Sequence, residues 1–187
     1  MTSRKNFLGG MLAAGAAPTL VPASVLGANA PSNRITLAGV GVGGIGFSQL
    51  QDCRTAGFEV VALCDLDWTY AKRTFDKFPD ARRYKDYREM LRAEGDRADA
   101  LYCGCPDHWH TLVTLAALAA KKHVCCVKPL TRKVDECRAV VAAAKKAGTA
   151  TQVTACTSND EASVRLYEIL DAGLLGEVRD VAAWSRR

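Results

Sequence analysis

The sequence lacks the features that mark nucleic-acid-binding and membrane-spanning proteins. Aromatic residues make up only 7% of the 187 residues, and basic residues never form a run longer than a pair. Nucleic-acid-binding proteins usually gather lysine and arginine in blocks or on one face, so we expect no nucleic-acid partner despite the net charge of +5. No stretch supplies the roughly 20 strongly apolar residues of a transmembrane helix.

What the chain does contain is the composition of a folded globular domain. Hydrophobic residues make up 49% and charged residues 24% of the chain, which excludes a disordered tail and a collagen-like fibre. A chain of this length buries roughly 70% of its unfolded surface, which is enough for one hydrophobic core. We therefore expect a single folded domain.

The first 30 residues have the pattern of an export signal. They contain no acidic residue, begin with Arg4 and Lys5, continue through an apolar stretch over 7–25 and end in Ala28-Asn29-Ala30. The residues around the basic pair resemble the twin-arginine export motif, with lysine in place of the second arginine. We expect cleavage after this segment and a periplasmic or secreted mature protein without a membrane span. An uncleaved anchoring helix is the alternative.

Eight cysteines raise the question of disulfides and metal ligands. No C-x-x-C pair is present, and most of the cysteines lie in or beside apolar runs, where cysteine behaves as a small hydrophobic residue. Cys125 and Cys126 are adjacent and would point to opposite faces of one strand. Cys105, His108 and His110 lie close together, but their spacing fits no common zinc site. We expect neither a disulfide framework nor a bound metal.

After residue 30, apolar β-branched runs alternate with segments of helical periodicity. The expected strands cover 35–40, 58–64, 98–103, 123–127, 149–155 and 178–184, and the expected helices cover 45–56, 67–78, 86–95, 107–122, 131–148 and 158–173. Near-continuous apolar strands that alternate with helices indicate a parallel sheet covered on both faces. Right-handed crossovers then give a doubly wound α/β fold of the Rossmann type.

Residues 41–46 match the glycine-rich turn G-x-G-x-x-G and stand between an expected strand and an expected helix. In this motif Gly41 allows the tight turn, Gly43 lets the backbone approach a pyrophosphate, and Gly46 lets the helix pack close to the sheet. The pattern therefore predicts a dinucleotide-binding turn. A tight strand–helix turn without a ligand is the alternative.

The glycine turn is followed by groups suited to a dinucleotide. The N–H groups at the head of the helix, those of Gly44 and Ile45, would face the pyrophosphate. Asp65 ends the second expected strand. Its carboxylate would accept hydrogen bonds from both ribose hydroxyls and repel a 2′-phosphate, which favours NAD over NADP. A helix cap or a solvated loop acid is the alternative for Asp65, and Asp67 competes for the cap.

Two more loops follow expected strands at the sheet edge where ligands of such folds bind. The first, residues 105–110, contains His108 and His110, for which a direct role and a satisfied first-turn side chain are both open. The second contains Lys128 before Pro129. Burying this lysine without a function would cost much free energy, and its ammonium could orient a substrate oxygen beside a nicotinamide. A surface lysine is the alternative.

This set of motifs resembles the Gfo/Idh/MocA oxidoreductases, the family of glucose–fructose oxidoreductase and inositol dehydrogenase. The matching stretches are 41–46, 63–65, 84–87, 106–110, 128–131, 176–178 and Trp184. The resemblance implies an NAD(P)-binding Rossmann domain over 31–173, with 174–187 as the start of a second α/β domain of which the chain has only the beginning. That second domain would supply most substrate contacts and the oligomer interface.

The resemblance also implies roles for single residues. The glycine turn and Asp65 would hold the dinucleotide, Pro106 and His108 would lie near the nicotinamide ribose, and Lys128 would contact substrate and nicotinamide. Two positions depart from the family pattern, because Val127 replaces a glutamate and Cys105 replaces a usual threonine.

Three functions stay open at this point. The first is an NAD-dependent dehydrogenase of sugar or cyclitol hydroxyl carbons, in which the protein places the groups and the cofactor carries the hydride. The second is a glycoside hydrolase or lyase of the same family that uses NAD transiently and accumulates no NADH. The third is a non-catalytic NAD-binding module. We expect the chain by itself to bind NAD without dehydrogenase activity.

Overall fold

The computed structural model describes residues 33–154 and 161–184 of the chain. The expected export signal over 1–30 lies outside the described residues, as do Cys156 and the expected start of the last helix at Ser158. Within the two described segments, no helix is both long enough and apolar enough to cross a bilayer.

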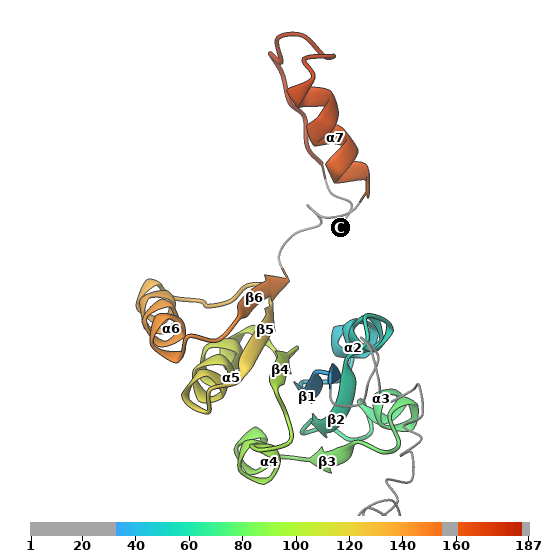
Figure 1. Ribbon diagram of the computed structural model, residues 1–187, viewed down its shortest axis with the longest axis vertical. Coiled ribbons are helices and arrows are strands. Elements are labelled where there is room, and N and C mark those ends of the chain that lie inside the picture. Colours follow the sequence, from blue (N-terminus) through green and yellow to red (C-terminus); the bar gives the residue numbers. More distant parts are fainter. Residues whose placement is uncertain (1–32, 155–160, 185–187) are drawn as a thin grey trace, which may run out of the picture.

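A six-stranded parallel sheet forms the centre of the fold (Figure 1). Its strands are β1 (Thr36–Val40), β2 (Glu59–Cys64), β3 (Arg82–Tyr84), β4 (Ala100–Cys103), β5 (His123–Val127) and β6 (Thr151–Thr154). They lie in the order β3-β2-β1-β4-β5-β6. This order confirms the predicted doubly wound Rossmann fold and reverses direction between β1 and β4, which makes that junction the topological switch point.

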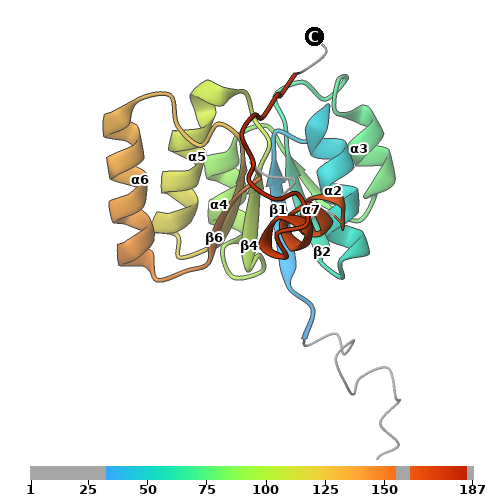
Figure 2. The ribbon, with the colours of Figure 1, turned by 90° about the horizontal axis from the view of Figure 1, so that it is seen from above.

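Helices cover both faces of the sheet, as Figure 2 shows. They are α2 (Ile45–Thr55), α3 (Lys72–Lys77), α4 (Tyr87–Glu94), α5 (Asp107–Ala119) and α6 (Val134–Ala147). A further helix, α7 (Glu161–Asp171), follows β6 in the chain and covers neither face. Residues of α4, α5 and α6 share one buried cluster with the sheet, and residues of α2 and α3 share another. Cys126 belongs to the first cluster and Cys125 packs against the second, which confirms that these adjacent cysteines face opposite sides.

The apolar faces of two helices differ from the expected ones. In α5 the helical spacing of apolar residues predicts an inward face made of Leu112, Leu115, Ala116 and Ala119. Leu112 and Ala119 are exposed, and Val113, Ala117 and Leu118 are buried instead. In α6 the expected inward residues Val134 and Val141 are 69% and 46% exposed, and Val140 is buried. Both helices are rich in alanine and leucine or valine on several sides, so periodicity alone does not fix which side meets the sheet.

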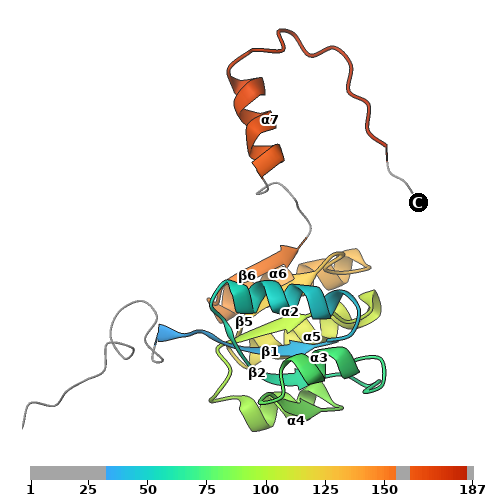
Figure 3. The same cartoon turned by 90° about the vertical axis from the view of Figure 1, so that its right-hand side faces the viewer.

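Two elements near the ends of the sheet also differ from expectation. The structure adds β3, whose residues Arg82-Arg83-Tyr84 show no apolar alternation and form a strand by pairing beside β2. The expected strand over 178–184 is not formed. That segment and α7 stand away from the sheet (Figures 1 and 3), and α7 buries no residue. A strand needs a hydrogen-bonded neighbour, and this segment has none among the described residues.

A buried carboxylate joins α4 to the edge of the sheet. Glu94 is 1% exposed, and its Oε1 accepts hydrogen bonds from the Tyr84 hydroxyl at 2.5 Å and from Arg82 Nη1 at 3.2 Å. Its Oε2 pairs with Arg97 at 3.4 Å. Burial and the Glu94 contact raise the pKa of Tyr84 above its usual value. Arg82 and Arg97 therefore compensate the negative charge of the buried Glu94 carboxylate.

Replacing Glu94 by alanine should destabilise the fold strongly. The change leaves the Tyr84 hydroxyl and two guanidinium groups without their acceptor, and we expect the free energy of unfolding in urea to fall by about 3 kcal/mol. Glu168→Ala is the matched control, because Glu168 pairs with Arg165 on the solvent-exposed surface of α7 and such pairs contribute little. An equally small loss for both variants would show that Glu94 does not fasten α4 to β3.

Candidate dinucleotide site

A cavity of about 540 Å³ opens at the carboxyl ends of the strands, beside the switch point between β1 and β4. It is lined by the glycine turn, the segment after β2 and the loops that follow β3 and β4. A larger hollow of about 960 Å³ lies at the opposite ends of the strands, lined in part by 33–35, 54–60 and 76–81. Ligands of open α/β sheets bind at the carboxyl ends, so the smaller cavity is the candidate site.

The glycine turn touches the loop after β4 backbone to backbone. Gly41 has φ +71°, and a Cβ at this position would lie 2.4 Å from the backbone nitrogen of Cys105. A Cβ on Gly46 would lie 2.4 Å from the Gly41 carbonyl oxygen, and one on Gly104 would lie 2.7 Å from the same oxygen. Gly41 and Gly104 therefore allow the contact between the two loops, and Gly46 allows α2 to begin close to the turn. The sequence motif identified Gly41 and Gly46 but gave no signal for Gly104, which belongs to a different loop.

Asp65 fastens the glycine turn from the neighbouring strand end. Its Oδ2 accepts hydrogen bonds from the N–H groups of Val42 at 2.9 Å and Gly43 at 3.1 Å, and its Oδ1 accepts from the N–H of Asp67 at 3.0 Å. A carboxylate offers about four acceptor positions, so one position is left for a ligand. In this arrangement Asp65 can therefore accept a hydrogen bond from one ribose hydroxyl, where the sequence predicts two.

Asp67 takes the capping role that had been an alternative for Asp65. Its Oδ1 accepts from the N–H groups of Thr69 at 3.0 Å and Tyr70 at 2.9 Å. The side chain therefore stabilises a turn that precedes α3, which begins only at Lys72 and not at residue 67. From α3, the buried Thr74 hydroxyl donates to the Val42 carbonyl at 2.6 Å, a second connection between this segment and the glycine turn.

The amides at the head of α2 remain available to a ligand. Among the described residues, the N–H groups of Gly44 and Ile45 have no hydrogen-bond partner, while those of Gly46 and Phe47 donate to carbonyls of the turn. Free N–H groups and the positive end of a helix dipole form an anion-binding site. The Asp65 carboxylate binds the two preceding amides of the turn, those of Val42 and Gly43, and lines the same cavity. The cavity therefore offers both donors for a phosphate and an acceptor for a hydroxyl.

Pro106, at the end of the loop after β4, and His108, in the first turn of α5, line the same cavity, and both residues are exposed. Trp109 is half-buried and packs edge to face on Tyr87 with ring centroids 6.3 Å apart. His110 is fully buried. Its Nδ1 lies 2.5 Å from the Pro129 carbonyl oxygen and its Nε2 lies 2.6 Å from the Cys105 carbonyl oxygen, so this ring joins the loops after β4 and β5. The structure thus favours the satisfied side chain for His110 and leaves His108 as the histidine that a ligand can reach.

Lys128 follows β5 and is exposed, outside the lining of the cavity. Because Lys128 is exposed, the free-energy cost of burying a lysine does not arise, and the structure favours the alternative of a surface lysine. No ion pair or hydrogen bond of Lys128 is present among the described residues. Its ammonium is therefore free for a substrate group, and a role in catalysis stays a prediction.

Comparison with known proteins identifies the family. A model of the oxidoreductase family with an NAD-binding Rossmann fold, GFO_IDH_MocA, matches residues 35–155. The chain belongs to the Gfo/Idh/MocA oxidoreductases. It is 32% identical over 142 residues to an inositol 2-dehydrogenase of Salmonella typhimurium, a match that covers 74% of this chain and 42% of that protein. The chain thus spans about two fifths of the length of that curated relative.

Solved structures share the fold of this domain. An NAD-binding oxidoreductase from Klebsiella pneumoniae is 28% identical with a TM-score of 0.66, over 77% of this chain and 40% of that one. A myo-inositol 2-dehydrogenase from Lactobacillus plantarum has the same fold with a TM-score of 0.72 at 23% identity, over 78% and 43% of the two chains. The described domain is therefore the NAD-binding Rossmann domain of a Gfo/Idh/MocA oxidoreductase.

The structure shows what surrounds Val127 and Cys105, the two residues that depart from the family pattern. Val127 is 8% exposed and belongs to the core cluster under α2 and α3, so an apolar residue fits the position. Cys105 is half-buried and lines the cavity. Neither departure closes the cavity.

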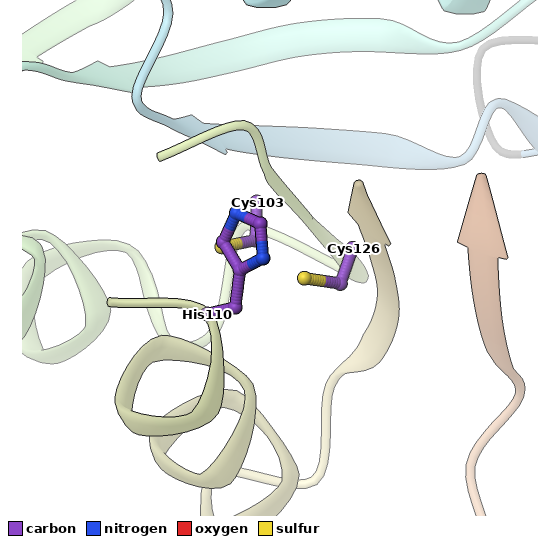
Figure 4. A group of neighbouring side chains, drawn as sticks. All are labelled: Cys103, His110 and Cys126. Atoms are coloured by element: carbon purple, nitrogen blue, oxygen red, sulfur yellow. The ribbon is translucent and has the colours of Figure 1, made fainter. Parts of the chain in front are cut away.

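Cys103, His110 and Cys126 form a buried group whose donor atoms lie within 4.8 Å of one another (Figure 4). A hydrogen bond with Cys105 and burial raise the pKa of Cys103 to about 12, and a hydrogen bond with Cys103 and burial raise that of Cys126. Both ring nitrogens of His110 lie against carbonyl oxygens, Nδ1 against that of Pro129 and Nε2 against that of Cys105. In this arrangement His110 has no ring nitrogen free to ligate a metal ion, which leaves only the two sulfurs of the group as ligands.

In the sequence, Cys105, His108 and His110 lie close together, but their spacing fits no common zinc site. The structure brings Cys103 and Cys126 together instead, because they are register partners on the adjacent strands β4 and β5. The sequence alone does not show which residues of distant strands pair, so it could not predict that Cys103 and Cys126 lie together.

The contact between the glycine turn and the loop after β4 gives a direct stability prediction. Gly41→Ala should lower the free energy of unfolding by about 3 kcal/mol, because the new Cβ meets the Cys105 backbone and the residue keeps a positive φ. Gly148→Ala is the control, since Gly148 has φ +67° with nothing within 4 Å of a Cβ and should cost about 1 kcal/mol. Equal losses in thermal or urea unfolding would show that the two loops do not pack closely.

Proposed function

We propose that this chain is the cofactor-binding domain of an NAD-dependent dehydrogenase that acts on a hydroxyl-bearing carbon of a sugar or cyclitol. The observation that carries the proposal is the pair of unpartnered amides at Gly44 and Ile45 beside the Asp65 carboxylate, inside a cavity at the switch point. The substrate class is supported by the likeness to inositol 2-dehydrogenase, of which the chain covers 42%.

In this proposal the chain binds and orients the dinucleotide. The amides of Gly44 and Ile45 bind the pyrophosphate at the head of α2. Asp65 accepts from a ribose hydroxyl with its remaining position, and its charge disfavours a 2′-phosphate. Pro106 and His108, at the start of α5, flank the nicotinamide ribose. These contacts favour NAD over NADP.

Hydride transfer requires groups other than the residues that bind the dinucleotide. When bound, the nicotinamide supplies the site that accepts or gives the hydride. Lys128, exposed and unpaired at the end of β5, orients the substrate oxygen by donating a hydrogen bond from its ammonium. Placement outside the cytosol is also proposed, and it rests on the export-signal pattern in the sequence of residues 1–30.

Calorimetric titration with NAD and NADP tests the proposal. The 187-residue chain should bind NAD more tightly than NADP. Asp65→Asn should weaken NAD binding by about tenfold, because a charge-assisted hydrogen bond is lost, and should narrow the preference over NADP. Asparagine keeps the size of the side chain but has one acceptor oxygen in place of two, so a hydrogen bond to the N–H of Asp67 or to the glycine turn is also lost. That loss should weaken NAD and NADP alike, so the change in the NAD:NADP preference reports the charge.

Asp171→Asn serves as the matched control, because Asp171 is an exposed acid at the end of α7. It should bind both dinucleotides like the unchanged chain. Absence of NAD binding by the unchanged chain, with the fold intact by circular dichroism, would contradict the proposal. An unchanged NAD:NADP preference in Asp65→Asn would remove Asp65 from cofactor selection.

A further inference from the structure

Tyr70 lies against the glycine turn although the motif contains no aromatic residue. A Cβ on Gly43 would lie 2.3 Å from Cδ1 and 2.4 Å from Cε1 of the Tyr70 ring, and a Cβ on Gly44 would lie 2.5 Å from the Tyr70 hydroxyl oxygen. Tyr70 is also 66% exposed and lines the candidate cavity. A large aromatic side chain therefore rests on the two glycines at the mouth of the cradle and still faces solvent.

The position of Tyr70 is set by its backbone. Asp67 accepts a hydrogen bond from the Tyr70 N–H at 2.9 Å, and the next residue, Ala71, is fully buried. Thr74, one turn further on, is hydrogen-bonded to the Val42 carbonyl. Asp65 before the tyrosine and Thr74 after it are both hydrogen-bonded to the glycine turn, so the backbone of this segment is held beside the turn and places Tyr70 at this wall of the cavity.

The hydroxyl of Tyr70 has the chemistry of a third donor at the head of α2. It lies beside Gly44, whose N–H and that of Ile45 have no partner in the described part of the chain. The hydroxyl itself has no hydrogen-bond acceptor among the described residues. A phenol O–H can donate to a phosphate oxygen, and a hydrogen bond to a charged group is stronger than one between neutral groups.

We propose that Tyr70 is a dinucleotide-binding residue, whose hydroxyl donates to a pyrophosphate oxygen that also accepts from the amides of Gly44 and Ile45. The inference rests on the proposed function, since it needs a dinucleotide in this cavity. It adds a ligand contact that the glycine motif does not contain. It also gives Gly43 and Gly44 a second reason to be glycine, because a side chain at either position would displace the tyrosine ring.

Two substitutions separate the hydroxyl from the ring. Tyr70→Phe keeps the ring on Gly43 and removes only the donor, so NAD and ADP-ribose, which share the pyrophosphate, should both bind about tenfold more weakly. Tyr70→Ala should bind at least as weakly as Tyr70→Phe. The measurement is calorimetric titration of the 187-residue chain, with circular dichroism and thermal unfolding to show that each variant is folded.

Tyr167→Phe is the matched control, because Tyr167 is an exposed tyrosine on α7, 57% exposed and remote from the cavity. It should leave both affinities unchanged. Equal affinity of Tyr70→Phe and the unchanged chain would overturn the inference while leaving the proposed function in place. Tighter binding by Tyr70→Ala would also overturn it, because the side chain would then compete with the ligand. Failure of the unchanged chain to bind either ligand would overturn the proposed function and the inference with it.

Discussion

Backbone meets backbone where the strand order reverses, and no side chain fits between the two loops. The Gly41 position lies against the Cys105 nitrogen, while Gly46 and Gly104 both lie against the Gly41 carbonyl. This close contact brings the start of α2 down onto the sheet. As a result, the first amides of α2 point into the cavity between β1 and β4 and not into a protein hydrogen bond.

The segment after β2 holds this arrangement from the other side. Asp65 accepts hydrogen bonds from the N–H groups of Val42 and Gly43, and the Thr74 hydroxyl donates to the Val42 carbonyl. Neither side chain binds the next two amides, those of Gly44 and Ile45, which have no partner among the described residues. The first amides of the glycine turn are therefore hydrogen-bonded within the protein, and the last two are available to a ligand. A pyrophosphate fits the open end because it needs donors, and a ribose fits the carboxylate because it needs an acceptor.

The sequence predicts the fold and the centre of the site because both depend on local patterns. Strand–helix alternation gives the Rossmann class, and the spacing of Gly41, Gly43 and Gly46 gives the turn. The rest depends on contacts between distant segments. The edge strand β3 forms by pairing, Cys103 meets Cys126 through strand register, and Lys128 is exposed by the path of the chain after β5. The contact of Tyr70 with Gly43 likewise spans 27 positions, so no motif encodes it.

The central claim is that the pyrophosphate of NAD binds the open amides at the head of α2. A ¹H–¹⁵N NMR titration of the chain with NAD tests it most directly. The account predicts that the largest chemical-shift changes occur at the amides of Gly44 and Ile45. Unchanged Gly44 and Ile45 signals, with the largest changes around the hollow at residues 33–35 and 76–81, would contradict it.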